Sequence, residues 1–177
     1  MTRYVAFLRA INVGGHIVKM DRLRAICEAI PLSGVSTFIA SGNLIFQSKK
    51  PAAHLEAAIE KRLRTELGYE VTTMVRTCAE VSAIVAHVEA HRLGPGGGVR
   101  LYVGFLKTTP SSRTASTVAA LSNETDALSV HGRELYWRSS ASFSLSTIAP
   151  AKLEKVASTP VTFRNFNTVQ RIARRPA

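Results

Sequence analysis

The sequence predicts an α+β protein, because runs that alternate apolar and polar residues are interspersed with runs that place apolar residues every three or four positions. Within residues 1–76 these runs follow the order β-α-β-β-α-β, which is the order of a ferredoxin-like sandwich. The order β-α-β-β then recurs in the second half of the chain. We therefore expect a ferredoxin-like N-terminal lobe, a second and smaller α+β lobe, and a C-terminal basic helix.

Six elements are predicted in the first 76 residues. Four short runs are rich in Val, Ile, Phe and Thr, as in strands, and two longer runs carry an apolar stripe at helical spacing. Pro31 ends the first helix, while Pro51 and Gly68 suit the entry and exit of the second. The predicted strands cover 3–10, 35–39, 44–46 and 71–75, and the predicted helices cover 20–30 and 51–68.

A connecting segment, 77–98, precedes the second lobe at 99–177; an alternative is that both lobes form one compact domain. The segment opens with a helix, which the capping box Thr77-Cys78-Ala79-Glu80 would start. Its glycine-rich loop, 94–98, lacks the Gly-Lys-Ser/Thr ending of a phosphate loop. In the second lobe, strands are predicted over 99–106, 127–130 and 134–137, and helices from 109, from 150 and from 162 onward.

The last predicted helix has the clearest pattern of the chain. From Thr162 onward, one helical face would carry Phe166, Val169, Ile172 and Ala173. The opposite face would gather basic and amide side chains, those of Arg164, Asn167, Arg171, Arg174 and Arg175. A helix docked by its apolar face would therefore present a basic stripe to its surroundings.

The chain has 23 Lys and Arg residues against 12 Asp and Glu residues, a net charge of +11. This excess favours anionic partners, either small molecules or nucleic acid. Only two aspartates occur, Asp21 and Asp126. Few carboxylates are therefore present to bind magnesium, which makes magnesium-dependent phosphoryl transfer an unfavoured function. No apolar run is long enough to span a membrane and no secretory signal is recognised, so we expect a cytoplasmic protein without a membrane partner.

No catalytic or metal-binding set can be read from the sequence. His87 and His91 stand four residues apart on one predicted helix, but a third ligand is missing, so we expect no metal and no cofactor. Cys27 and Cys78 stand outside any Cys-x-x-Cys motif. The serines at 139–146 lack the Gly-x-Ser-x-Gly elbow of hydrolases. Whether the protein is an enzyme stays open.

Two polar turns are the best candidates for a ligand site in the first half. Residues 9–16 leave the first strand and turn on Gly14 and Gly15, close to the side-chain amide of Asn12. Such a loop can hold an anion on its backbone N–H groups, yet it also serves as a tight connection that needs positive φ at glycine. The second turn, 40–43, joins the next two strands through Ser41 and Gly42.

Five motifs occur in order along the chain: Phe-Leu-Arg-Ala-Ile-Asn-Val-Gly-Gly at 7–15, Thr-Phe-Ile-Ala-Ser-Gly-Asn at 37–43, Val-Arg-Thr at 75–77, Gly-Arg-Glu-Leu-Tyr at 132–136 and Thr-Phe-Arg-Asn-Phe-Asn-Thr-Val at 162–169. Together they resemble the motifs of a widespread bacterial family, domain of unknown function 1697. Ala10, Ala40 and Phe166 stand where that family usually has Gly, Gln and Trp. The resemblance implies a compact ferredoxin-like arrangement and supplies no activity.

Polar and glycine residues of these motifs are the candidate ligand-binding residues, because packing explains them less readily than it explains leucines. They are Arg9, Asn12, Gly14, Gly15, Ser41, Gly42, Asn43, Arg164, Asn165, Asn167 and Thr168. Asn and Thr also cap helices and Gly-Asn makes turns, so a structural role stays open. The leading hypothesis is that Arg9, the loop 12–15 and a helix start at 164–167 hold a small anionic ligand. Arg164→Ala should then weaken binding and leave the melting temperature nearly unchanged.

Two alternatives remain. One is non-specific nucleic-acid binding through the basic C-terminal helix, with Arg171, Arg174 and Arg175 as contacts and an affinity that falls steeply with salt. The other is an enzyme acting on a small phosphorylated or carboxylated substrate, which ranks lower because no nucleophile–base pair is recognised. The sequence says nothing of the oligomeric state.

Overall fold

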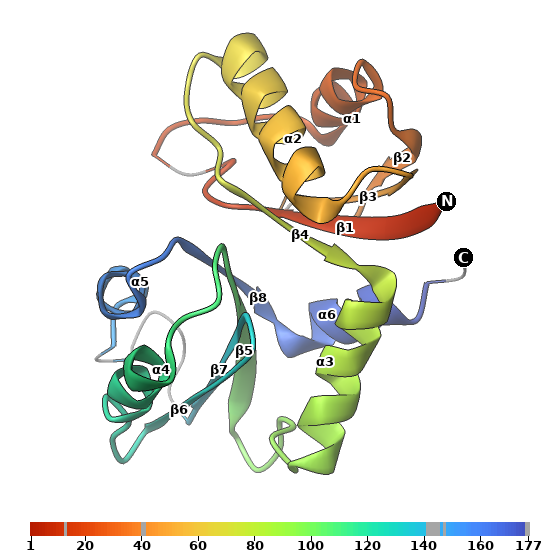
Figure 1. Ribbon diagram of the computed structural model, residues 1–177. Coiled ribbons are helices and arrows are strands. Elements are labelled where there is room, and N and C mark those ends of the chain that lie inside the picture. The colour runs from red at the N-terminus through yellow and green to blue at the C-terminus, as the bar shows by residue number, and fades with distance from the viewer. Residues whose placement is uncertain (13, 40–41, 141–145, 147, 176–177) are drawn as a thin grey trace. The chain divides into compact units, whose positions relative to one another are not determined.

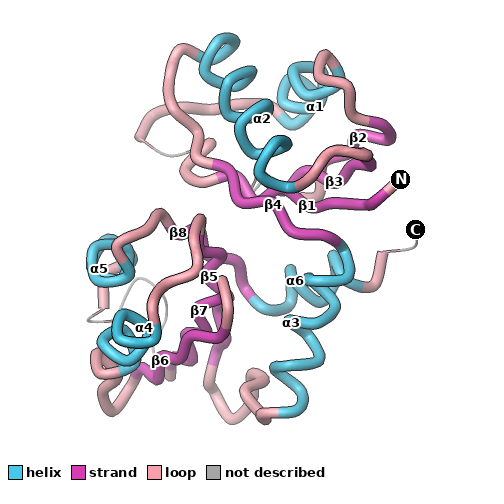
Figure 2. The backbone as a smooth tube through the Cα atoms, viewed as in Figure 1, coloured by secondary structure: helices cyan, strands magenta, loops and turns pink. Residues whose placement is uncertain are grey.

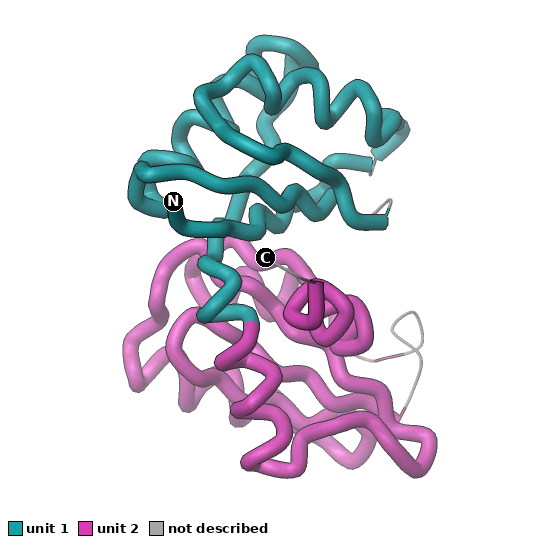
Figure 3. Tube along the Cα trace, turned by 90° about the vertical axis from the view of Figure 1, so that its right-hand side faces the viewer, with its two compact units in different colours: residues 1–81, 176–177 teal, residues 82–175 magenta. Residues whose placement is uncertain are grey.

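The computed structural model describes residues 1–12, 14–39, 42–140, 146 and 148–175 (Figure 1). The described residues form two four-stranded antiparallel sheets and six helices, which confirms the α+β class. The chain divides into two compact units, called unit 1 (Met1–Val81) and unit 2 (Ser82–Arg175) (Figure 3). In the described ranges no helix is both long enough and apolar enough to cross a membrane.

Unit 1 follows the order β-α-β-β-α-β. Its sheet has the order β2-β3-β1-β4, in which the first strand of the chain is central and every neighbouring pair is antiparallel. Both helices lie on one face of this sheet (Figure 1). The elements are β1 (Thr2–Leu8), α1 (Met20–Glu28), β2 (Ser33–Thr37), β3 (Asn43–Ser48), α2 (Ala52–Leu67) and β4 (Thr73–Thr77).

The core of unit 1 lies between this sheet and its two helices. Alternate residues of β1, such as Ala6 and Leu8, face Leu23 of α1 and Ile59 of α2 in one apolar cluster. Burying a side chain of this size stabilises the fold by about 2 kcal/mol. Cys27 belongs to the same cluster, and burial, with the charge of Glu28 adding, raises the pKa of its thiol to about 12. The thiol therefore acts as a small apolar group.

Unit 2 has the same arrangement of strands, in the order β6-β7-β5-β8, again antiparallel throughout. Helices α4 and α5 pack on one face of the sheet, while α6 packs against β5 and β8 on the other (Figure 1). Helix α3 (Cys78–Ala90) precedes this unit's first strand. The remaining elements are β5 (Arg100–Leu106), α4 (Ser112–Ala119), β6 (Asp126–His131), β7 (Glu134–Ser139), α5 (Pro150–Ala157), β8 (Val161–Asn165) and α6 (Phe166–Ala173).

The predicted helix from Thr162 onward is wrong in its first turn, because residues 161–165 form strand β8. The side chains of this stretch alternate: Val161 and Phe163 join the cluster under α4 and α5, while Thr162 and Arg164 point to the other face. The helix starts only at Phe166, after Asn165 has capped it. The strong apolar pattern of the helix extended the prediction over the preceding strand, in which successive side chains point to opposite faces of the sheet.

The N-termini of two helices follow ordinary capping rules. The predicted capping box of α3 is confirmed: the amide of Glu80 donates to Thr77 Oγ1 at 3.1 Å, and the amide of Thr77 donates to Glu80 Oε2 at 2.7 Å. Helix α4 starts later than predicted, at Ser112, because the hydroxyl of Ser111 accepts the amide of Thr114 and is the N-cap.

Gly42 lies where the β2–β3 turn meets the end of β1. Its carbonyl accepts the amide of Leu8 at 2.9 Å. A Cβ on Gly42 would lie 2.6 Å from Ile11 Cγ2 and 3.2 Å from Leu8 Cβ, and the residue has φ +73°. The position therefore requires glycine both for its left-handed backbone and for space.

Gly42→Ala should lower the free energy of unfolding by about 2–4 kcal/mol, the sum of a left-handed alanine and a crowded contact. Gly34→Ala is the matched control, because Gly34 also has positive φ, +60°, but no described atom lies within 4 Å of its Cβ position. The control should lose only about 1 kcal/mol. Urea unfolding followed by far-UV circular dichroism measures both, and equal losses would contradict the close-contact explanation.

Candidate functional site

The segment between β1 and α1, residues 9–19, is called the glycine loop (Figure 2). Hydrogen bonds from three different parts of unit 1 hold it. The amide of Arg9 donates to Thr72 O at 2.8 Å, and Tyr69 Oη donates to Ile11 O at 3.0 Å. The amide of Val18 donates to Asn12 Oδ1 at 2.7 Å. The predicted site residue Asn12 thus closes the loop on itself.

The middle of the glycine loop is exposed. Gly14 and Gly15 have φ +69° and +87°, and no described atom lies within 4 Å of a Cβ built on either of them. Their backbone conformation requires glycine, whereas the space around them does not. Ile17 is 85% exposed although the next residue, Val18, is buried.

The turn that precedes β3 lies against the glycine loop through Gly42, as described above. Asn43 is fully buried, and its Nδ2 donates to Phe38 O at 3.0 Å, while the amide of Phe38 donates to Asn43 O at 2.9 Å. Asn43 therefore braces the turn. Ser41, another predicted site residue, lies outside the described residues.

Backbone strain is found on both of these segments. Ala10 has φ +56° and Ile39 has φ +51°, and they are two of the four described non-glycine residues with positive φ. A β-branched residue in this region is a clear outlier, and each such residue costs about 1–3 kcal/mol. Strain of this size persists where the surrounding structure imposes it, and it clusters at functional sites.

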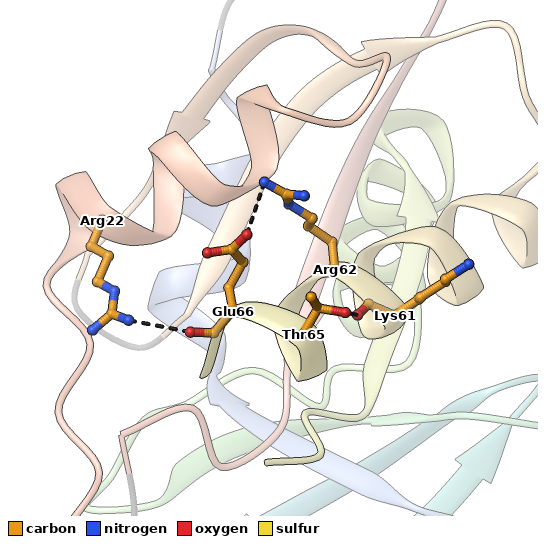
Figure 4. Close-up of polar contacts among 5 residues, drawn as sticks. All are labelled: Arg22, Lys61, Arg62, Thr65 and Glu66. Carbon is orange, nitrogen blue, oxygen red and sulfur yellow. Dashed lines mark hydrogen bonds and ion pairs between the residues drawn. The ribbon is translucent and has the colours of Figure 1, made fainter. Parts of the chain in front are cut away.

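Two aromatic rings and one guanidinium group lie beside the glycine loop. The rings of His16 and Tyr69 stack with centroids 3.9 Å apart and an interplanar angle of 20°. Arg22 donates from Nη2 to Glu66 O at 3.2 Å, at the end of α2 (Figure 4). Burial raises the pKa of Tyr69, and the nearby charge of Arg22 opposes this rise. His16 and Arg22 are both exposed.

Arg164 is not at a helix start, which corrects the prediction. It lies in β8 opposite Val103 and is only 7% exposed. Its Nη1 donates to Thr162 Oγ1 at 2.9 Å and to Phe163 O at 2.8 Å. Burial lowers the pKa of this guanidinium to about 10. The basic stripe predicted for the last helix therefore does not include Arg164.

The other motif residues of unit 2 lie at the start of α6. Asn165 Oδ1 accepts the amide of Asn167 at 2.9 Å, which makes Asn165 the N-cap. Asn167 is exposed and Thr168 is half-buried. One side of α6 is buried through Phe166, Val169 and Ile172. The exposed basic residues are Arg171 in the helix and Arg174 and Arg175 directly after it.

Sequence reasoning missed a buried arginine in unit 1 that corresponds to Arg164. Arg76 is 1% exposed and lies in β4 opposite Val5, just as Arg164 lies in β8 opposite Val103. In both units the next residue is the N-terminal cap of a helix. The shared signal is Arg-[Thr/Asn]-x-x-x-Val, at 76–81 and again at 164–169.

A buried carboxylate in unit 2 was also missed. Asp126 accepts hydrogen bonds from Trp137 Nε1 at 2.7 Å, Ser146 Oγ at 2.9 Å and Thr125 Oγ1 at 3.0 Å. Burial by itself raises the pKa of Asp126, but hydrogen bonds from Ser139, Trp137, Ser146 and Thr125 outweigh it and lower the pKa. Asp126 borders a hollow of about 180 Å³, and its lone pairs are used to fix the surrounding chain.

Three histidines come together at the C-terminal end of α3. The ring centroid of His87 lies 4.1 Å from that of His91, 4.4 Å from that of His131 and 4.9 Å from that of Tyr136. Burial lowers the pKa of His87, and the neighbouring His131 and His91 lower it further. Among the residues that the structure describes, no group of three or more His, Cys, Asp or Glu side chains is arranged to hold a metal ion.

A second hollow, of about 270 Å³, lies between the end of α1 and the middle of α2. Its apolar lining includes Ile30 and Ala58. Arg62 stands at this hollow and binds the carboxylate of Glu66 at 2.9 Å (Figure 4). The Nε of Arg62 is buried without a hydrogen-bond acceptor in the described part of the chain. The hollow holds none of the residues predicted from the motifs.

Comparison with known proteins gives a family and a fold. The model of the family described as "Protein of unknown function (DUF1697)" matches residues 1–136. The solved structure of the conserved bacterial protein SP0830 from Streptococcus pneumoniae is similar, with a TM-score of 0.71 and 21% identity over 98% of this chain and 97% of that chain. No curated protein matches the chain. This similarity shows that the two proteins share a fold over almost the whole chain, and it gives no activity.

Because Arg164 is buried and bonded, Arg164→Ala should lower the free energy of unfolding by about 2–4 kcal/mol, through a cavity and two unpaired acceptors. This reverses the outcome expected from the sequence. Urea unfolding followed by the fluorescence of Trp137, the single tryptophan and a member of the same unit, measures the loss. Arg174→Ala is the exposed control, expected within about 0.5 kcal/mol of the parent. An equally stable Arg164→Ala protein would remove its structural role.

Proposed function

The chain belongs to the DUF1697 family of proteins of unknown function, and from its own geometry we propose that it binds a small anionic ligand at the glycine loop of unit 1. The family brings no activity, so the proposal is supported by this chain's residues alone. The proposed ligand-binding residues are Arg9, Asn12, Gly14, Gly15 and Ser41, while Gly42 and Asn43, which are buried, hold the turn beside them. The motif residues of unit 2 are assigned to the structure of β8 and α6.

The observation that carries the proposal is strain on two segments in contact. Ala10 and Ile39 hold left-handed backbone on either side of the contact between Gly42 and Ile11. The side chains of Ala10 and Ile39 are both exposed, so their own burial does not offset this cost of about 1–3 kcal/mol each. A binding site that needs a fixed, open backbone gives a reason for this strain.

The charge of this region selects an anion. The glycine loop and the first turn of α1 carry Arg9, Lys19 and Arg22 against one acid, Asp21. That acid is partnered by Arg24, whose Nη2 lies 3.6 Å from its carboxylate. The N-cap of α1, Lys19, offers no side-chain hydrogen bond to the helix amides. Backbone N–H groups and arginines are the donors that phosphates and carboxylates prefer.

Inorganic phosphate and citrate, compared at constant ionic strength, should raise the melting temperature as their concentration rises. Arg9→Gln should weaken this binding about tenfold, because it removes a charge-assisted hydrogen bond worth about 1.5–3 kcal/mol. Calorimetric titration measures the affinity. Arg113→Gln, on an exposed face of α4, is the control and should bind as the parent does. Equal binding by both variants, or no binding by the parent, would refute the proposal.

A second candidate function is supported by α6. We propose that α6 and the two residues after it form a basic surface for nucleic acid. Phe166, Val169 and Ile172 of the helix are buried, while Arg171 in the helix and Arg174 and Arg175 at its C-terminal end are exposed. Positive charge at this density attracts phosphate backbones regardless of sequence.

We likewise propose that each unit is a ferredoxin-like sandwich. The equivalent strand orders of the two sheets support this proposal.

Replacing Arg171, Arg174 and Arg175 together by Gln should reduce the dependence of log affinity on log salt by about one per arginine. Fluorescence anisotropy of labelled single-stranded RNA over a range of salt concentrations measures this slope. The matched control replaces Lys49, Lys50 and Lys61, three exposed lysines of unit 1, by Gln. An equal reduction in both triple variants would show that net charge, and not α6, governs binding.

A further inference from the structure

His16 and Tyr69 form a ring pair whose outer member is exposed. The ring centroids are 3.9 Å apart and the ring planes are nearly parallel. His16 belongs to the exposed part of the glycine loop. Tyr69 is half-buried, and its hydroxyl is bonded to the backbone at Ile11. The ring of Tyr69 is thus fixed by this hydrogen bond, and the exposed ring of His16 stacks on it.

Hydrogen bonds hold the loop independently of the stack. The loop is already fixed by hydrogen bonds from Arg9, Val18 and Tyr69, none of which needs the imidazole of His16. Beside His16, Ile17 is 85% exposed. An exposed planar ring next to an exposed aliphatic side chain offers a surface on which a flat apolar group can stack.

A positive charge stands next to this surface. Arg22 donates a hydrogen bond to the backbone carbonyl of Glu66. It lies close enough to Tyr69 for its charge to lower the pKa of that hydroxyl against the effect of burial. The carboxylate of Glu66 does not neutralise it, because that carboxylate is turned to Arg62 at 2.9 Å (Figure 4). A guanidinium anchored at one nitrogen keeps several donors directed outward and is well suited to phosphate.

We propose that the ligand of the glycine loop is a nucleotide, a phosphate joined to a planar heterocyclic base. The base stacks on the exposed face of His16, and the phosphate binds Arg22 and the backbone of Gly14 and Gly15. This inference rests on the proposed anion-binding function and names its ligand class. Stacking tolerates every base, because each has a π-face, so the surface selects nucleotides as a class and not one base.

Calorimetric titration of the full chain with AMP, CMP, adenosine and inorganic phosphate tests the inference. Both nucleotides should bind about tenfold more tightly than phosphate, the ratio that one stacked base contributes. His16→Ala should bring the nucleotides down to the affinity of phosphate, while His16→Phe should keep their advantage because it keeps a ring. His54→Ala, an exposed histidine on α2, is the control and should change nothing.

The outcomes separate the two proposals. If phosphate binds but the nucleotides bind no more tightly, or if His16→Ala keeps their advantage, the nucleotide inference is wrong and the anion site stands. If phosphate and the nucleotides both fail to bind, the anion site is wrong as well. A loss in His16→Ala that His16→Phe shares would assign the effect to the imidazole nitrogens and would also overturn the stacking role.

Discussion

The antiparallel pairing of β1 with both of its neighbours determines where a ligand site can lie in unit 1. Because Phe7 pairs with Asn43 and Leu8 pairs with Thr73, the end of β1 coincides with the beginnings of β3 and β4. The segments that follow β1 and precede β3 and β4 therefore meet at one edge of the sheet. Tyr69 reaches Ile11 for this reason, although 58 residues separate them in the chain.

Local signals were sufficient to predict most elements and insufficient to predict contacts between them. The capping box at Thr77 and the helix exit at Gly68 depend on neighbours in sequence, and the structure has both. Strand β8 was missed because a strong apolar stripe begins one residue after it. His16 finds its ring partner Tyr69 on a distant segment, and Asp126 is bonded by Trp137 on the next strand and by Ser146 beyond it. No pattern within a short window contains these contacts.

The two units place the same unusual residue at the same point. Arg76 and Arg164 are both buried on the edge strand beside the central one, and each is followed by a helix cap. A buried guanidinium is costly unless its donors are bonded, so a pair of them in equivalent places reflects one structural solution used twice. Together with the equivalent sheet orders, this correspondence shows that the two units share one arrangement of strands and one position for a buried arginine.

Ala10 shows what happens when a position designed for glycine acquires a methyl group. At φ +56° a side chain with a Cβ meets a steric penalty that glycine avoids, and Ala lacks the polar group with which Asn or Asp can hydrogen-bond locally in this conformation. The penalty falls on the folded state, so the loop must be held by its surroundings. The register of the sheet does this, because it fixes Arg9 on Thr72 directly before Ala10.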